Sequence, residues 1–169
     1  GLFKTTNKGI SWEPIFDDQD VSSVSAIAVS QKNPNILWAG TGETFLIRPA
    51  HAIGDGIYKS EDGGNTWKNM GLQKTARIAK IVIHPKNDKI VYVAALGHTF
   101  GPQEDRGIYK TTNGGKTWKK ILFIDQNTGG IDIALDRKNP NFLIASMWEI
   151  YINTWGLNSG GESGGVFIS

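Results

Sequence analysis

The 169-residue chain contains no cysteine, which excludes disulfide bonds, thiolate chemistry and cysteine-based metal sites. No apolar run approaches the roughly 20 residues of a membrane span. The charge is nearly balanced, with 18 Lys and Arg against 16 Asp and Glu, so nothing favours a nucleic-acid partner. Segments with a helical period are short and broken by Gly or Pro, and helix is therefore expected to be scarce.

Glycine and tryptophan are plentiful, at 21 and 6 residues, and two motifs recur along the chain with a shared period of about 50 residues. Copies of the first, which reads GIYKS in its second copy, begin at Gly1, Gly56, Gly107 and Gly165. Copies of the second, a pair of apolar runs around a Lys-Asn turn, begin at Ala26, Lys80 and Ile131. Each motif is typical of a hairpin, so one period predicts four antiparallel strands.

Four antiparallel strands repeated at this period predict an all-β fold, namely a β-propeller built of four-stranded blades. The predicted division gives strands 3 and 4 of one blade in 1–15, full blades in 24–72 and 78–123, and strands 1 to 3 of a further blade in 130–169. These add up to thirteen strands. Because propellers close with about four to eight blades, we expect a fragment of about three blades from a larger ring.

Within the first motif an eight-residue turn, called the octad below, reads Ser/Thr-x-Asp/Asn-x-Gly-x-Ser/Thr-Trp. The Asp or Asn side chain can accept backbone N–H groups across the turn, and Gly supplies the positive φ. The Trp is expected to pack against the neighbouring sheet. We therefore assign structural rather than catalytic or metal-binding roles to Asn7, Gly9, Trp12, Asp62, Gly64, Trp67, Asn113, Gly115 and Trp118.

The three octads resemble Asp-boxes, also called bacterial neuraminidase repeats. Together with the surrounding runs AVSQKNPNILWAGTGE and GDGIYKSEDGGNTWKNMGL, they are similar to bacterial sortilin-like and glycosyl-hydrolase-like propellers of the xyloglucanase type. The resemblance implies a protein exported from the cytoplasm, whether secreted, periplasmic or on the cell surface. It also implies that the octads lie on the side of the ring away from the ligand.

The connections between strands 2 and 3 of each blade differ in length and content, and they share the face opposite the octads. Unlike loops on one face of a rigid ring commonly carry binding sites. The candidate catalytic carboxylates there are Glu43, Asp55, Glu104, Asp105 and Glu149. The candidate ligand-binding residues are Arg48, His51, His98, Arg106, Tyr151 and Trp155. For any one carboxylate a solvated loop residue is the favoured interpretation, and Trp155 suits packing of its loop against the ring equally well.

Two functions remain open. The favoured one is a non-catalytic binding or scaffold propeller for a protein, peptide or polysaccharide. The alternative, from the resemblance, is a glycoside hydrolase in which two carboxylates act as general acid and base, about 6.5–9.5 Å apart for inversion or about 5 Å for retention. No cofactor is predicted, and His51 and His98 do not form a close metal-binding pair, although calcium at surface loops stays open.

Overall fold

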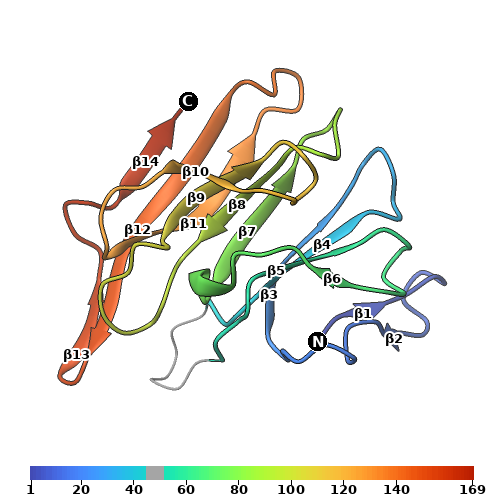
Figure 1. The fold of residues 1–169 in the computed structure, drawn as a ribbon, viewed down its shortest axis with the longest axis horizontal. Helices are drawn as coiled ribbons and strands as arrows, with labels where there is room; N and C mark the ends of the chain where they lie inside the picture. Colours follow the sequence, from blue (N-terminus) through green and yellow to red (C-terminus); the bar gives the residue numbers. More distant parts are fainter. Residues whose placement is uncertain (45–51) are drawn as a thin grey trace.

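The computed structural model describes residues 1–44 and 52–169. The described residues form four antiparallel sheets that follow one another along the sequence (Figure 1). Helix is limited to one 3-10 turn, η1 (Gln73–Thr75), among the residues described. The predictions of four-stranded antiparallel sheets and of scarce helix are confirmed. None of the helical structure in these residues has the length and hydrophobicity needed to cross a membrane.

The sheets are built in chain order from the following strands. The first sheet pairs β1 (Phe3–Lys4) with β2 (Glu13–Pro14). The second contains β3 (Val24–Val29), β4 (Leu37–Thr41), β5 (Ile57–Ser60) and β6 (Lys68–Asn69). The third contains β7 (Ile78–Ile83), β8 (Val91–Ala95), β9 (Gly107–Thr111) and β10 (Lys119–Leu122). The fourth contains β11 (Thr128–Leu135), β12 (Leu143–Asn153), β13 (Gly156–Ser159) and β14 (Gly165–Ile168).

The fourth sheet contains a strand, β13, that the sequence analysis does not predict. β12 is 11 residues long and pairs with β14 through its first part and with β13 through its last part. The sequence predicts the segment after Trp148 as a loop, but the strand continues through it to Asn153, and Ile150 is buried there. Asn153 then forms the turn into β13, with its side chain accepting two backbone N–H groups.

Neighbouring sheets pack face to face through the alternating side chains of their strands. In β8, which is buried throughout, Val91 and Val93 belong to the cluster shared with the second sheet. Tyr92 and Ala94 belong to the cluster shared with the fourth sheet. Because successive side chains point to opposite faces, a strand between two sheets is apolar at every position. This explains the continuous apolar runs of the second motif.

The octads form compact turns that are closed by their own side chains. In the second octad the Ser60 hydroxyl accepts the N–H of Gly64 at 2.8 Å. Asp62 accepts the N–H of Thr66 at 2.9 Å and the Thr66 hydroxyl at 2.6 Å. The other two octads repeat these backbone contacts with Asn in place of Asp. Each octad is therefore a self-contained unit whose shape does not depend on a ligand.

The octad tryptophans join neighbouring sheets through a repeated hydrogen bond. The indole N–H of Trp67 donates to the carbonyl of Ile15 at 2.6 Å. The indole N–H of Trp118 donates to the carbonyl of Met70 at 2.8 Å. Each acceptor lies three residues after the tryptophan of the preceding octad, so the same bond fixes the second sheet to the first and the third sheet to the second.

The glycine of the octad is required where this contact is made. Gly115 has a φ of 91°, and a Cβ there would lie 2.6 Å from the ring of Trp38. Trp38 in turn packs edge to face on Trp118, with ring centroids 6.0 Å apart. Any side chain at Gly115 would therefore be strained in its backbone and would also push the two sheets apart.

We expect Trp67→Ala to lower the free energy of unfolding by about 3 kcal/mol, because it removes a large packed side chain and a hydrogen bond between sheets. Trp12→Ala is the matched control, since Trp12 occupies the same octad position but is 58% exposed. Its expected cost is below about 0.5 kcal/mol. Urea unfolding followed by circular dichroism measures both. Equal losses in the two variants would contradict the packing role of Trp67.

The octad also predicts a pH dependence. Hydrogen bonds from the Thr66 hydroxyl, the Thr66 N–H and the Ser60 hydroxyl hold the pKa of Asp62 at about 2, below its ordinary value of 3.8. A lowered pKa stabilises the fold fully above the ordinary value, and this contribution is lost as the pH falls through about 2. The free energy of unfolding should therefore fall less between pH 7 and pH 2 in Asp62→Asn than in the parent chain. Parallel curves for the two proteins would refute this role.

Candidate functional site

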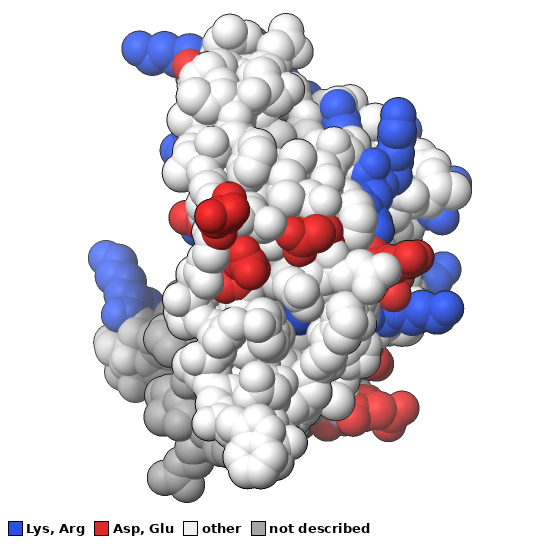
Figure 2. Space-filling model, turned by 90° about the vertical axis from the view of Figure 1, so that its left-hand side faces the viewer, with Lys and Arg blue, Asp and Glu red and all other residues white. Residues whose placement is uncertain are grey.

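The connections between strands 2 and 3 lie on the side of the sheets opposite the octad turns. In Figure 1 the described connection 97–106 and the β12–β13 turn project to the lower left, and the octads project to the right. Figure 2 views the molecule from that left side and shows Asp and Glu side chains gathered near the middle, with Lys and Arg mostly toward the edge. We call this side the loop face.

The first connection is described only in part, because the candidates Arg48 and His51 lie outside the described residues. Asp55 accepts the hydroxyl of Tyr58 at 2.5 Å and that of Thr41 at 3.4 Å. Glu43 accepts the N–H of Ala52 at 3.3 Å. Burial, followed by the hydrogen bond to Asp55, raises the pKa of Tyr58. The carboxylate of Asp55 thus ties its loop to the sheet.

Two arginines are buried beneath the second connection. Arg77 and Arg106 are 1% and 0% exposed, and both donate to the carbonyl of His98 at 2.9 Å. Arg106 also donates to the carbonyls of Asn127 and Ile150, at 3.1 and 3.0 Å. The sequence predicts Arg106 as a ligand-binding candidate, but the structure places its guanidinium below the loop face, where it holds three chain segments together.

The pKa values of these arginines reflect their burial. Loss of solvation lowers the pKa of Arg77 to about 10, with a further contribution from Arg106. Loss of solvation also lowers the pKa of Arg106 to about 10, although Asp125 opposes that change. Both side chains therefore remain cationic at neutral pH. Their charge is balanced mainly by carbonyl dipoles rather than by a direct carboxylate partner.

The other candidates of the second connection lie on its surface. The backbone N–H of His98 donates to the Gln103 side chain at 2.6 Å, and Gln103 in turn donates to the carbonyl of Lys74. His98 is exposed, and Glu104 accepts a long hydrogen bond of 3.5 Å from the amide of Gln126. Asp105 contributes its carbonyl to the Tyr109 hydroxyl. The sequence analysis does not identify Gln103, which carries no motif.

The third connection brings two carboxylates to one serine. Glu149 accepts the N–H of Ser163 at 3.2 Å, and the side chain of the same serine contributes to lowering the pKa of Asp125. Burial alone would raise the pKa of Asp125, but hydrogen bonds from Ser163 and from the N–H of Asn127 outweigh it and lower that pKa. The sequence singles out Glu149 but not Asp125 or Ser163, because their proximity depends on how two loops from different sheets meet.

An exposed aromatic residue lies at the turn between β12 and β13. Trp155 is 93% exposed, and its backbone N–H donates to the Asn153 side chain at 3.0 Å. Tyr151 lies on the same hairpin and pairs with Asn158. The hairpin is supported on its other side, where Phe100 of the second connection pairs with Ile152. Within residues 1–44 and 52–169 Trp155 is therefore not packed against a sheet, and its indole is presented to solvent on the hairpin.

No group of three His, Asp or Glu side chains converges to hold a metal ion within residues 1–44 and 52–169. The arrangement on the loop face therefore consists of an exposed aromatic hairpin, a serine-linked carboxylate pair and a loop fixed from below by two arginines. It suits recognition of a ligand by stacking and by hydrogen bonds.

The four-stranded antiparallel sheets, packed face to face in chain order, define the class of the protein as a β-propeller. Residues 55–159 match the family model Sortilin-Vps10, described as sortilin, neurotensin receptor 3. Since this match covers more than half of the sequence, the chain belongs to the Sortilin-Vps10 family.

The chain is also similar to individual proteins. The chain is 30% identical over 100 residues to a probable oligoxyloglucan-reducing end-specific xyloglucanase of Neosartorya fischeri, covering 56% of this chain and 10% of that protein. The crystal structure of an ancestral GH74 enzyme is similar over 88% of this chain and 19% of its own, with 25% identity and a TM-score of 0.65.

The GH74 enzyme of Niastella koreensis is similar over 100% of this chain and 26% of its own, with 19% identity and a TM-score of 0.68. The predicted propeller fold and the resemblance to sortilin-like and xyloglucanase-like proteins are confirmed. The chain spans about a tenth of the length of the curated relative that it matches.

We expect Arg106→Met to lower the free energy of unfolding by about 3 kcal/mol, because the carbonyls of His98, Asn127 and Ile150 lose a buried donor. Arg137→Met on the exposed turn after β11 is the control, with an expected cost below about 0.5 kcal/mol. Urea unfolding of both variants tests this. A cost for Arg106→Met no larger than that of the control would show that the buried arginine does not hold the loops.

Proposed function

We propose that the chain is part of a non-catalytic binding or scaffold propeller that recognises its ligand on the loop face. The observation that carries this proposal is the β12–β13 hairpin, which presents Trp155 at 93% exposure. An apolar ring of this size in water has no packing role within the described chain, and ordered exposed aromatics are typical of recognition surfaces. Tyr151 on the same hairpin adds a second ring.

The state of the carboxylates favours binding over catalysis. Asp55 is engaged by two hydroxyl groups of its own sheet, and Glu149 is engaged by the Ser163 N–H. A general acid at neutral pH needs a raised pKa. The pKa of Asp125 is lowered instead, so it does not suit that role. The face therefore offers stacking and hydrogen-bonding groups without an evident acid.

The ligand that we favour is a polysaccharide, because aromatic rings and hydrogen-bonding loops together suit sugar chains. The match to a probable xyloglucanase supports a glycan, while a protein or peptide remains the alternative ligand. We further propose that the ring is completed by other parts of a longer parent chain, since the first and last sheets expose Phe3, Val166 and Ile168. An exported location is proposed from the kinship with xyloglucanase-like proteins.

A glycoside hydrolase is the second candidate function. It is favoured by the serine-linked pair of Glu149 and Asp125 and by the 30% identity to the probable xyloglucanase. The lowered pKa of Asp125 would suit a base or a nucleophile, with the proton donor supplied by Glu149 or by another part of the protein.

Titration calorimetry with xyloglucan oligosaccharides tests the proposal. We expect Trp155→Ala to weaken binding about tenfold through loss of a single aromatic anchor, with unfolding unchanged. Trp12→Ala is the matched control, because it removes an exposed indole from the octad side. Equal affinities of the parent and Trp155→Ala would refute the assigned surface.

Release of reducing ends, assayed in the same mixtures, separates the two candidates. Binding without new reducing ends supports the scaffold function. Hydrolysis that Glu149→Gln abolishes would establish the glycoside hydrolase in its place.

A further inference from the structure

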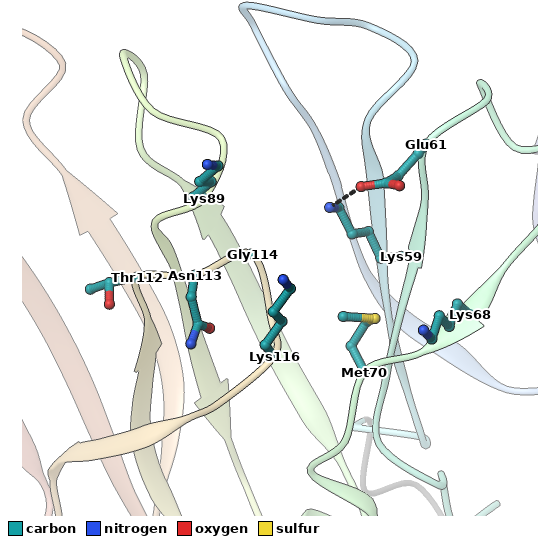
Figure 3. A pocket seen from close by; sticks show the side chains of 9 residues that line it. All are labelled: Lys59, Glu61, Lys68, Met70, Lys89, Thr112, Asn113, Gly114 and Lys116. Atoms are coloured by element: carbon teal, nitrogen blue, oxygen red, sulfur yellow. Dashed lines mark hydrogen bonds and ion pairs between the residues drawn. The ribbon is translucent and has the colours of Figure 1, made fainter.

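A basic pocket lies on the octad side of the molecule, between the second sheet (β3–β6) and the third sheet (β7–β10). We call this junction the second seam, and the junction between the first and second sheets the first seam. The pocket has a volume of about 520 Å³ and is lined by residues of both sheets. Figure 3 shows Lys59 and Lys68 on one side, with Lys89 and Lys116 on the other.

The charge of the pocket is strongly one-sided. Its four lysines face a single carboxylate, Glu61, which pairs with Lys59 (Figure 3). The hydrogen bond from Lys59 lowers the pKa of Glu61, so this carboxylate is ionised. Among the described residues no ion pair involves Lys68, Lys89 or Lys116. Three positive charges around the pocket are therefore unmatched within the described chain.

The third octad keeps a further carboxylate out of the pocket. Asn113 lines it and stands where the second octad has Asp62. Both residues close their octads in the same way, by accepting the N–H of the Ser/Thr position four residues later at 3.0 and 2.9 Å. The turn would therefore fold with either residue, and the neutral one is present where the pocket is basic.

The first seam provides an internal comparison, because the repeat places corresponding residues there. The carbonyl of Asn35 accepts the N–H of Gly63 at the first seam, as the carbonyl of Lys89 accepts the N–H of Gly114 at the second. The positions corresponding to the lysines of the pocket are occupied at the first seam by Lys4, Glu13, Asn35 and Asn65. Only one of these is cationic, and that one donates to the carbonyl of Gly63 at 2.7 Å. The charge is thus a property of the second seam and not of the repeat.

We propose that the second seam binds a compact oxyanion of at least two charges, of the phosphoryl or sulfate kind. Lysine ammonium groups act as mobile point charges and suit such groups, whereas a flat carboxylate is matched best by arginine, which the pocket lacks. The Thr112 hydroxyl and the Asn113 amide at the rim provide neutral polar groups. The site lies on the opposite side from the loop face and does not depend on the function proposed for that face.

Titration calorimetry of the chain with pyrophosphate at low ionic strength tests this site, and sulfate is the second probe. We expect one pyrophosphate per chain, with binding that weakens as salt is raised from about 0.01 M to 0.15 M because the charges are exposed. Tighter binding of pyrophosphate than of sulfate assigns a phosphoryl group, and similar binding assigns either oxyanion. Both results support the site.

Asn113→Asp is the decisive variant, because it adds a carboxylate to the pocket while preserving the octad hydrogen bonds seen at Asp62. We expect it to weaken pyrophosphate binding about tenfold, as one added charge at close range does. Asn7→Asp is the matched control, since it makes the same change in the first octad and alters the net charge equally.

Two results would overturn the proposal. One is the absence of saturable pyrophosphate binding at low ionic strength. The other is equal weakening by Asn113→Asp and Asn7→Asp, which would show that the net charge of the chain and not this pocket attracts the anion. Unfolding curves of both variants establish that the fold is retained. Lys89→Asn introduces the residue found at the corresponding position of the first seam, and it checks the assignment of the pocket without changing an octad.

Discussion

The hydrogen bond from an octad indole to a carbonyl of the preceding sheet is the interaction on which the rest of the architecture depends. Trp67 reaches Ile15 in this way, and Trp118 reaches Met70. Hydrogen bonds within a sheet fix its strands but not its position relative to the next sheet. The octad indole fixes that position, because its ring packs between the two sheets and its N–H donates to one particular carbonyl of the preceding sheet. The spacing of the acceptor, three residues after the preceding tryptophan, makes the junction repeat with the sequence.

Much of the fold follows from the sequence because it is encoded locally and repeatedly. Alternating or continuous apolar runs predict the strands, and the octad predicts its own turn, since Asp62 or Asn113 can satisfy backbone groups only a few residues away. The extra strand β13 escapes prediction because the turn after Asn153 carries neither the octad pattern nor the Lys-Asn pattern of the repeated hairpins. It is stabilised by the neighbouring connection through Phe100 and Ile152, a contact between distant segments.

The candidate site is less predictable than the fold, and the two buried arginines show why. In the sequence Arg106 is a charged residue at the end of a variable loop. Such a position suits a ligand contact as well as a structural role. Its burial results from three carbonyls that the connections of two sheets bring together. A buried guanidinium needs several acceptors to offset the loss of solvation, and such a set can only be recognised once the loops are placed. The same holds for the serine that joins Glu149 to Asp125.

The octad separates the requirements of folding from those of surface chemistry. Five of its positions are constrained, namely the first hydroxyl, the Asp or Asn, the glycine, the second hydroxyl and the tryptophan. The second and sixth positions vary in charge, and they hold Glu61 and Asn65 in the second octad but Thr112 and Lys116 in the third. Even the Asp or Asn choice changes the charge without changing the turn. A propeller of this kind can therefore give each seam its own electrostatic character while every blade keeps the same packing, so the side that carries the structural repeat is also free to acquire a binding function.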